Sequence, residues 1–329
     1  MRRFRSSLLS FLLTALLTLM LAGCGGGGGS DSPQPAPQTD SEVPPTPPPP
    51  PPPQTGDTSL FPNAELLVSV QDLDTPSTIV LDARHSVDAY NAGHIPGAIY
   101  TPPDLFSTKH ILRPVAELEQ VLGGLGITRT SKIIIYDDTT ASLGAGGRLF
   151  WLLEYLGCTN VSILNGGWDQ WEIQRMPVTT VVPPPLPPAV FTALVNDAIY
   201  VTKEYVASRL NALDFTLVDV RTDLEYQGLL PNDDPRLGHI PGAISFPYTE
   251  CYNSDKTVLN FNDLKLLLQS KGITTANEVV AYSTVGKRSA FFYFLFRLMD
   301  YTNVANYDGS ILEWGSSDPV LYPMVTGPL

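Results

Sequence analysis

Cysteine and histidine are scarce in this chain. Its 329 residues include three cysteines, Cys24, Cys158 and Cys251. There is no C-x-x-C pair, no C-x-x-C-H motif and no H-E-x-x-H motif, and metal-ligand spacing is also missing among the four histidines, His85, His94, His110 and His239. We therefore expect no disulfide framework, no metal, no haem and no other cofactor.

Basic residues are also in short supply. Lysine and arginine number 20 against 33 acidic residues, which gives a formal net charge of −13. Loss of an N-terminal leader with its three arginines leaves 17 basic residues and a net charge near −16. Nucleic acids and anionic headgroups bind to basic surfaces that release counterions. The composition therefore argues against either as a partner.

Residues 1–23 have the layout of a signal peptide. Three arginines precede an apolar run from Leu8 to Leu21, which is too short to cross a bilayer comfortably and ends in Leu-Ala-Gly-Cys. This ending resembles the bacterial lipobox, which implies that Cys24 becomes a lipidated N-terminus attached to a membrane. The alternative is an ordinary secretory signal with a chance cysteine. Because Gly25 follows Cys24, the resemblance points to the cell envelope and to its outer membrane.

Proline and glycine mark the boundaries between the parts of the chain. Residues 24–59 are rich in glycine and proline and include the unbroken run from Pro47 to Pro53, which predicts a disordered tether. A second proline cluster predicts an interdomain linker over residues 179–195. We expect an N-terminal domain over 60–178 and a C-terminal domain over 196–329.

The two predicted domains repeat each other. Gly-His-Ile-Pro-Gly-Ala occurs at 93–98 and again at 238–243, each time after an apolar strand that ends in Asp-x-Arg. Further on, Ile133–Tyr136 matches Val279–Tyr282, and residues 163–168 are echoed by residues 305–310. The stretch from Tyr226 to Gly238 is nine residues longer than its counterpart from Tyr90 to Gly93.

Short β-branched runs alternate with helix-like patterns in both halves. Nearly continuous apolar strands are typical of parallel sheets covered on both faces. The expected fold class is α/β, with two tandem domains that each have a central, mainly parallel sheet and helices on both faces. Ligands of such sheets bind beyond the carboxyl ends of the strands.

The ordered motifs resemble the rhodanese family, over about residues 60 to 325. They are the Asp-x-Arg strand ends, the Gly-His-Ile-Pro-Gly-Ala loops, a Tyr-ending strand before a Gly/Arg loop, and a closing Asp-Gly-Ser segment with Glu-Trp. The match is to tandem two-domain sulfurtransferases. In that family a cysteine opens a six-residue loop of the second domain, and the loop amides with the following helix form an anion cradle that favours the thiolate.

The corresponding loop here begins with serine. It reads Ser283-Thr284-Val285-Gly286-Lys287-Arg288. The resemblance implies that Ser283 stands at the nucleophile position, that residues 284–288 bind an anion, and that Arg221, at the end of the Asp-x-Arg strand, binds substrate. With Lys287 and Arg288, Arg221 is expected to form a local positive pocket for a small oxyanion.

The serine changes the expected chemistry. A hydroxyl stays protonated near neutral pH and cannot form the sulfur–sulfur bond of a persulfide, so the standard two-step transfer loses its carrier. A serine hydrolase is disfavoured because Ser283 has no Gly-x-Ser-x-Gly elbow. The first domain's loop, which starts at Asp137 and continues to Arg148, also lacks cysteine, as is usual for the non-catalytic domain of tandem relatives.

Other candidate residues have both functional and structural interpretations. Cys251 could replace the missing carrier thiol or be an incidental loop residue, although Glu250 would raise its pKa. His94 and His239 recur in both domains and are interpreted as structural, and Cys158 as a small packed residue.

Three functional hypotheses follow. The first is an envelope module that lacks cysteine-persulfide activity and binds a small oxyanion or acts as a scaffold. The second is an active sulfurtransferase that uses Cys251 or an external thiol on a sulfur compound. The third is a subunit of an envelope redox or oxyanion-processing complex, in which a partner would supply the electron carrier.

Overall fold

The computed structural model describes residues 58–230 and 234–328. The predicted signal peptide, the lipidation site at Cys24 and nearly all of the predicted tether lie outside these residues. In the described ranges, no helix combines the length and the apolar character needed to cross a membrane.

Each half of the described chain has a five-stranded parallel sheet. In the first sheet the strand order is β1 (Leu67–Val68), β7 (Val161–Leu164), β6 (Ile133–Tyr136), β2 (Ile79–Asp82) and β3 (Ile99–Tyr100). In the second it is β10 (Ile244–Ser245), β9 (Phe215–Asp219), β11 (Glu278–Tyr282), β12 (Val304–Tyr307) and β8 (Tyr200–Val201). The predicted α/β class and tandem arrangement are confirmed.

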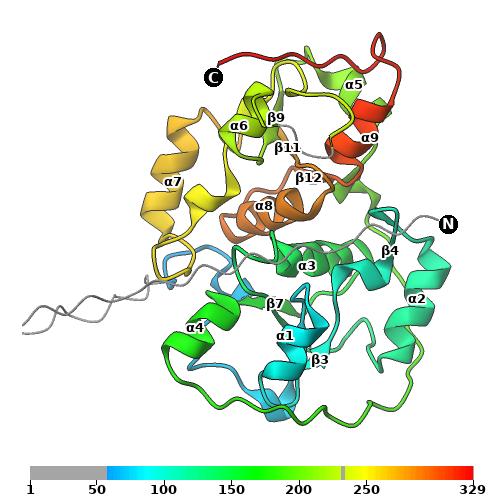
Figure 1. Cartoon of the computed structure of the whole chain (residues 1–329), viewed down its shortest axis with the longest axis vertical. Helices are drawn as coiled ribbons and strands as arrows, with labels where there is room; N and C mark the ends of the chain where they lie inside the picture. The colour runs from blue at the N-terminus through cyan, green and yellow to red at the C-terminus, as the bar shows by residue number, and fades with distance from the viewer. Residues whose placement is uncertain (1–57, 231–233, 329) are drawn as a thin grey trace, which may run out of the picture. The chain divides into compact units, whose positions relative to one another are not determined.

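Helices flank both sheets (Figure 1). Those of the first half are α1 (Val87–Ala92), α2 (Val115–Gly124), α3 (Ala145–Tyr155) and α4 (Gly167–Ile173). Those of the second are α5 (Lys203–Arg209), α6 (Asp223–Gln227), α7 (Phe261–Ser270), α8 (Lys287–Leu298) and α9 (Ser310–Ser316). An antiparallel pair, β4 (Ser107–Thr108) and β5 (Ile111–Leu112), and short 3-10 helices at 64–66, 75–77, 103–106, 197–199 and 248–251 complete the connections.

Alternation along the central strands divides the core. In β11, Val279 and Ala281 pack into a large apolar cluster with α7 and α8, whereas Val280 and Tyr282 pack on the opposite face with Trp314 of α9. Strand β6 alternates in the same way between α2–α3 and α4. Because successive side chains of a strand point to opposite faces, these apolar strands need cover on both sides.

Helices α3 and α8 join the two halves. They pack directly against each other, and Gly147 of α3 lies against the backbone of Phe291 in α8. The large apolar cluster therefore runs without a break from one sheet, through α3 and α8, to the other. Gly144, which caps α3, lies against the backbone of Lys287 and Arg288 at the start of α8.

After strands β7 and β12, the structural alignment of the two domains is shifted by one residue from the alignment that the sequence suggests. Gly167 and Ser310 share an unusual backbone conformation, with φ of 50° and 51°. The next residues, Trp168 and Ile311, donate their N–H groups to the first residues of the two loops. Residues 163–168 therefore correspond to 306–311, because these hydrogen bonds, and not residue similarity, fix the register.

Candidate functional site

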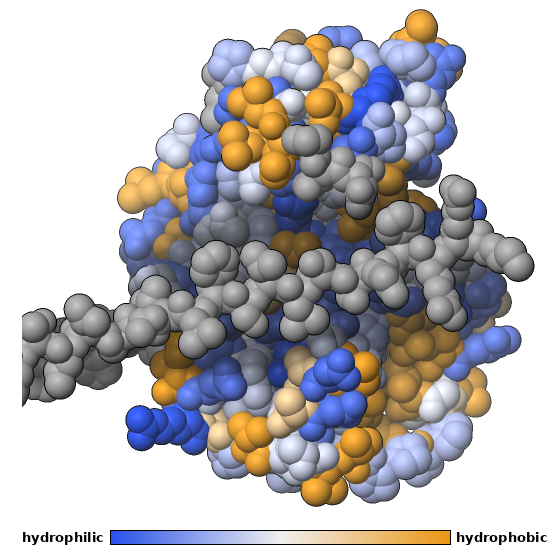
Figure 2. Space-filling view, in the orientation of Figure 1, coloured by the Kyte–Doolittle hydropathy of each residue, from blue (hydrophilic) through white to orange (hydrophobic). Residues whose placement is uncertain are grey.

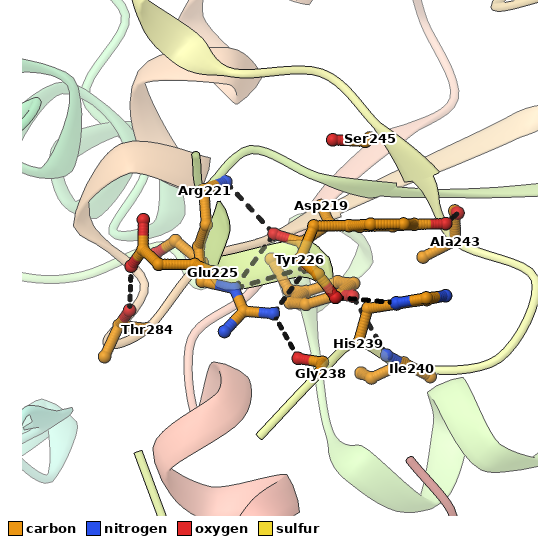
Figure 3. A network of polar contacts seen from close by, with 12 residues as sticks. Asp219, Arg221, Glu225, Tyr226, Gly238, His239, Ile240, Ala243, Ser245 and Thr284 are labelled. Carbon is orange, nitrogen blue, oxygen red and sulfur yellow. Dashed lines mark hydrogen bonds and ion pairs between the residues drawn. The ribbon is translucent and has the colours of Figure 1, made fainter. Parts of the chain in front are cut away.

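The repeated motifs assemble into one polar unit in each domain. At the end of β9, Asp219 binds Arg221 through both carboxylate oxygens, with a shortest distance of 2.7 Å. Nη2 of Arg221 also donates to the Gly238 carbonyl at 2.6 Å, and the Ile240 N–H donates to the Tyr282 hydroxyl at 3.1 Å (Figure 3). The strand end, the Gly-His-Ile-Pro-Gly-Ala loop and the central strand are thus connected.

The first domain contains the same unit. Arg84 binds Asp82 at 2.7 Å and donates to the Gly93 carbonyl at 2.7 Å, and the Tyr136 hydroxyl donates to Asp82. The first domain's loop from Asp137 to Arg148 has no cysteine nucleophile, so the hydrogen bonds between the Asp-x-Arg strand end and the Gly-His-Ile-Pro-Gly-Ala loop do not depend on catalysis. Arg221, with no exposed surface, therefore holds the fold together in this structure.

The extra residues before Gly238 add a second carboxylate to Arg221. Asp234, from the longer stretch of the second domain, accepts a hydrogen bond from Nη1 of Arg221 at 3.0 Å. On the face of the molecule seen in Figure 2, hydrophobic side chains gather over α6. The exposed hydrophobic residues in and after α6 are Leu224, Leu229, Leu230 and Leu237.

The two histidines are structural, in agreement with their interpretation from sequence. The ring of His239 stacks on Tyr226 with centroids 3.5 Å apart, and its Nδ1 lies 2.8 Å from the Tyr226 carbonyl. His94 makes the same contacts with Tyr90. Burial lowers the pKa of His239, which favours a neutral ring.

The loop of residues 283–288 lies between β11 and α8. Ser283 is buried, and its Oγ accepts the Gly286 N–H at 3.0 Å. Gly286 caps α8 with φ of 75°, in the left-handed region that favours glycine. The loop therefore keeps a tight turn in which an amide points at the side chain of its first residue.

The backbone carbonyls of residues 283–286 in the loop each accept a hydrogen bond. Those of Ser283 and Thr284 accept the N–H groups of α9 at 3.0 Å each, that of Val285 accepts from Arg148 at 3.0 Å, and that of Gly286 accepts from Ala290. In the described part of the chain, the amides of Val285, Lys287 and Arg288 donate to no acceptor. Such an array of amides at a helix N-terminus is suited to an anion.

Each cation of the positive pocket expected from sequence has a carboxylate partner in the structure. Arg288 binds both oxygens of Glu225, at 2.8 and 2.9 Å, and donates to the Thr284 hydroxyl at 2.8 Å. Lys287 lies 3.5 Å from Asp104 of the first domain. Arg221 has its own carboxylates, so all three charges are largely neutralised. Among the described residues, the groups of the loop that are left available for an anion are therefore backbone amides and not unpaired cations.

Sequence reasoning missed Glu225. It is the third helical residue of α6 and forms a capping box with Thr222, whose N–H donates to Glu225 at 2.9 Å. Burial raises the pKa of Glu225, but the hydrogen bonds and charge of Arg288 outweigh burial and lower it to about 2. The Thr-x-x-Glu pattern predicts the capping box from sequence, but nothing in the sequence indicates that Glu225 pairs with Arg288.

Neither described cysteine offers a reactive thiol. Cys251 has no exposed surface and lies in the main apolar cluster, and burial raises its pKa well above the usual value. Burial raises the pKa of Cys158 to about 12. These surroundings count against Cys251 as the replacement carrier. Among the described residues, no cluster of three or more His, Cys, Asp or Glu side chains could hold a metal ion.

Over the residues that the structure describes, the fold and the loop define a tandem α/β protein in which a tight loop with free backbone amides follows β11, the central strand of the second sheet. Two stretches, residues 69–174 and 202–317, match the rhodanese-like domain. The chain belongs to the rhodanese family.

Relatives span nearly the whole described region. A thiosulfate sulfurtransferase of Pseudomonas aeruginosa is 32% identical over 267 residues, covering 78% of this chain and 97% of the relative. The sulfur carrier protein TtuD of Thermus thermophilus is 30% identical over 274 residues, covering 78% and 95%. The anaerobic ergothioneine biosynthesis enzyme of Chlorobium limicola shares the fold, with a TM-score of 0.73, 24% identity, and coverage of 82% of this chain and 72% of the other.

Proposed function

We propose that this chain is a rhodanese-family protein without cysteine-persulfide chemistry, whose second domain binds a small sulfur oxyanion or serves as a scaffold. The observation that carries the proposal is the serine at position 283 in an otherwise intact loop, where its Oγ accepts the Gly286 N–H. A serine cannot carry sulfane sulfur, yet the amides around it still suit an anion. The relatives named as thiosulfate sulfurtransferases make thiosulfate the first ligand to test.

We further propose that the chain is attached to the bacterial cell envelope, at the outer membrane, through a lipid on Cys24. The motif around Cys24 and the glycine- and proline-rich stretch after it support this location. A partner in an envelope redox or oxyanion-processing complex is compatible with this position. Labelling with a fatty-acid analogue tests the anchor: Cys24→Ala should abolish incorporation, and retained labelling would contradict it.

Sulfur transfer from thiosulfate to cyanide tests the chemistry. We expect background turnover for the form that begins at Thr58, and a gain of at least about a hundredfold for Ser283→Cys, since loss of a catalytic nucleophile costs far more than that. Asp137→Cys, at the start of the first domain's loop, is the matched control and should gain nothing. Robust turnover of the parent would defeat the proposal and favour an external thiol as carrier.

Thiosulfate binding, measured by calorimetry, tests the anion site. Gly286→Ala should abolish binding because a Cβ atom there would lie 2.6 Å from the Asp308 carbonyl oxygen. Gly242→Ala is the matched control, since φ at Gly242 is 79°, close to the 75° of Gly286, but the nearest atom to a Cβ would be 3.9 Å away. If the parent binds no thiosulfate or sulfate, the scaffold role alone remains.

A further inference from the structure

The guanidinium of Arg148, a residue of the first domain, contacts the loop of residues 283–288 in the second domain. Arg148 is in the first turn of α3, and only 2% of its side chain is exposed. Its Nη1 donates to the Val285 carbonyl at 3.0 Å and lies 2.6 Å from Oδ1 of Asp308. Its Nη2 donates to the His110 carbonyl at 2.7 Å. Groups of both domains therefore fix the guanidinium.

The hydrogen bond from Arg148 orients a particular peptide unit. The Val285 carbonyl and the Gly286 N–H belong to the same planar trans peptide, so they point in opposite directions. Arg148 holds the carbonyl, while the N–H donates to Ser283 Oγ at 3.0 Å. Rotation of this peptide would withdraw the N–H and turn the negative end of the carbonyl toward residue 283.

The turn of the loop lies directly on the pair formed by Arg148 and Asp308. A Cβ atom at Gly286 would lie 2.7 Å from Nη1 of Arg148 and 2.7 Å from Oδ1 of Asp308. Asp308 is fully buried, and its Oδ2 accepts the N–H of Leu112, from the first domain, at 3.1 Å. Separating a buried ion pair leaves an uncompensated charge, so this support is stiff.

We propose that Arg148 is a positioning residue for the second domain's loop. It orients the Val285–Gly286 peptide so that the N–H stabilises negative charge on the side chain of residue 283 or on an anion beside it. The first domain thus completes the site through an arginine of its own loop region, although it has no nucleophile. The inference concerns the same loop as the proposed function and deepens it.

The pKa of a thiol introduced by Ser283→Cys reports the orientation of this peptide, because a hydrogen bond to the thiolate favours the charged form. Cys158→Ala and Cys251→Ala remove the other described thiols in every variant, and Asp308→Asn accompanies Arg148→Met alone, so that neither charge of the pair is left without its partner. With this background, we expect Arg148→Met to slow alkylation at pH 7 roughly tenfold, as a pKa raised by about one unit would do.

Arg297→Met is the matched control in the same background. Arg297 of α8 binds Glu154 of α3 at 3.1 Å, so its loss removes another ion pair across the same helix interface without contacting the loop. It should leave alkylation unchanged. Equal rates and pH profiles for the two variants, with unchanged near-ultraviolet circular dichroism, would overturn the inference.

A second measurement covers the case in which Arg148→Met does not fold. Arg148→Lys in the unmodified background keeps a cation beside Asp308 but loses the fixed geometry of the guanidinium. Hydrogen exchange of the Gly286 amide should then accelerate relative to Arg297→Lys, and equal exchange would contradict the inference. Neither readout requires a bound oxyanion, so failure of the proposed function would leave both tests intact.

Discussion

Replacing Glu225 with glutamine tests how much the ion pair between Glu225 and Arg288 contributes to stability. The carboxylate binds the Arg288 guanidinium with two hydrogen bonds and also accepts from Thr222. Only 2% of the Glu225 side chain is exposed, so solvent screens the pair weakly. Glu225→Gln keeps the size and one acceptor but removes the charge, which leaves Arg288 buried without a full partner.

The pKa of Glu225 gives the contribution of its carboxylate to the free energy of unfolding. Its value is about 2 in the folded protein against 4.5 for an ordinary glutamate. A depressed acid pKa contributes stability that is present above the unfolded value and is lost as the pH falls from about 4.5 toward 2. The contribution at pH 7 is about 3 kcal/mol, and less than about half of it remains at pH 3.

Urea unfolding of the parent and of Glu225→Gln between pH 7 and pH 3 measures this difference. We expect the variant to be less stable by about 3 kcal/mol at pH 7 and the gap to narrow at pH 3. Glu250→Gln, at a partly exposed acid that pairs with Lys271 at 3.5 Å, is the control and should show little change. A gap at pH 7 below about 1 kcal/mol, or one independent of pH, would refute the reasoning.

Two further predictions concern the arginines that follow the Asp-x-Arg strands and the two described cysteines. Arg221→Met and Arg84→Met should each destabilise the protein by about 3–5 kcal/mol in urea unfolding, because each breaks a buried pair; a variant at Arg221 that loses thiosulfate binding at full stability would show a binding role instead. Cys158 and Cys251 should react with iodoacetamide only after unfolding, as followed by mass spectrometry, since burial raises the pKa of both; labelling of Cys251 in the folded chain would restore it as a candidate carrier.

The fold could be predicted because its signals are local. The central strands are short apolar runs that end at polar motifs, and the two domains present these motifs in the same order. The loop could be located for the same reason, since Ser283 follows β11 directly and Gly286 marks the turn into α8. Spacing along the chain determines these features.

The partners of the charged side chains could not be predicted in this way. Glu225 meets Arg288 across 63 residues, and Arg148 meets Asp308 across the domain interface. Arg288 is read from sequence as a free cation, because its carboxylate is brought near only by the packing of separate elements. For this reason sequence reasoning could not foresee that the three cations of the expected positive pocket each have a carboxylate partner.

The same ion pairs explain why an intact loop does not by itself indicate an active enzyme. Breaking the buried pairs of Arg288 or Arg148 would cost several kcal/mol of folding stability, so folding preserves the loop whether or not it performs chemistry. Residue 283 is different, because its contact with the Gly286 N–H needs only an acceptor that a hydroxyl provides. Stability therefore permits serine at this position, whereas persulfide chemistry does not. Ser283→Cys is accordingly the substitution that separates the structural role of the loop from its catalytic one.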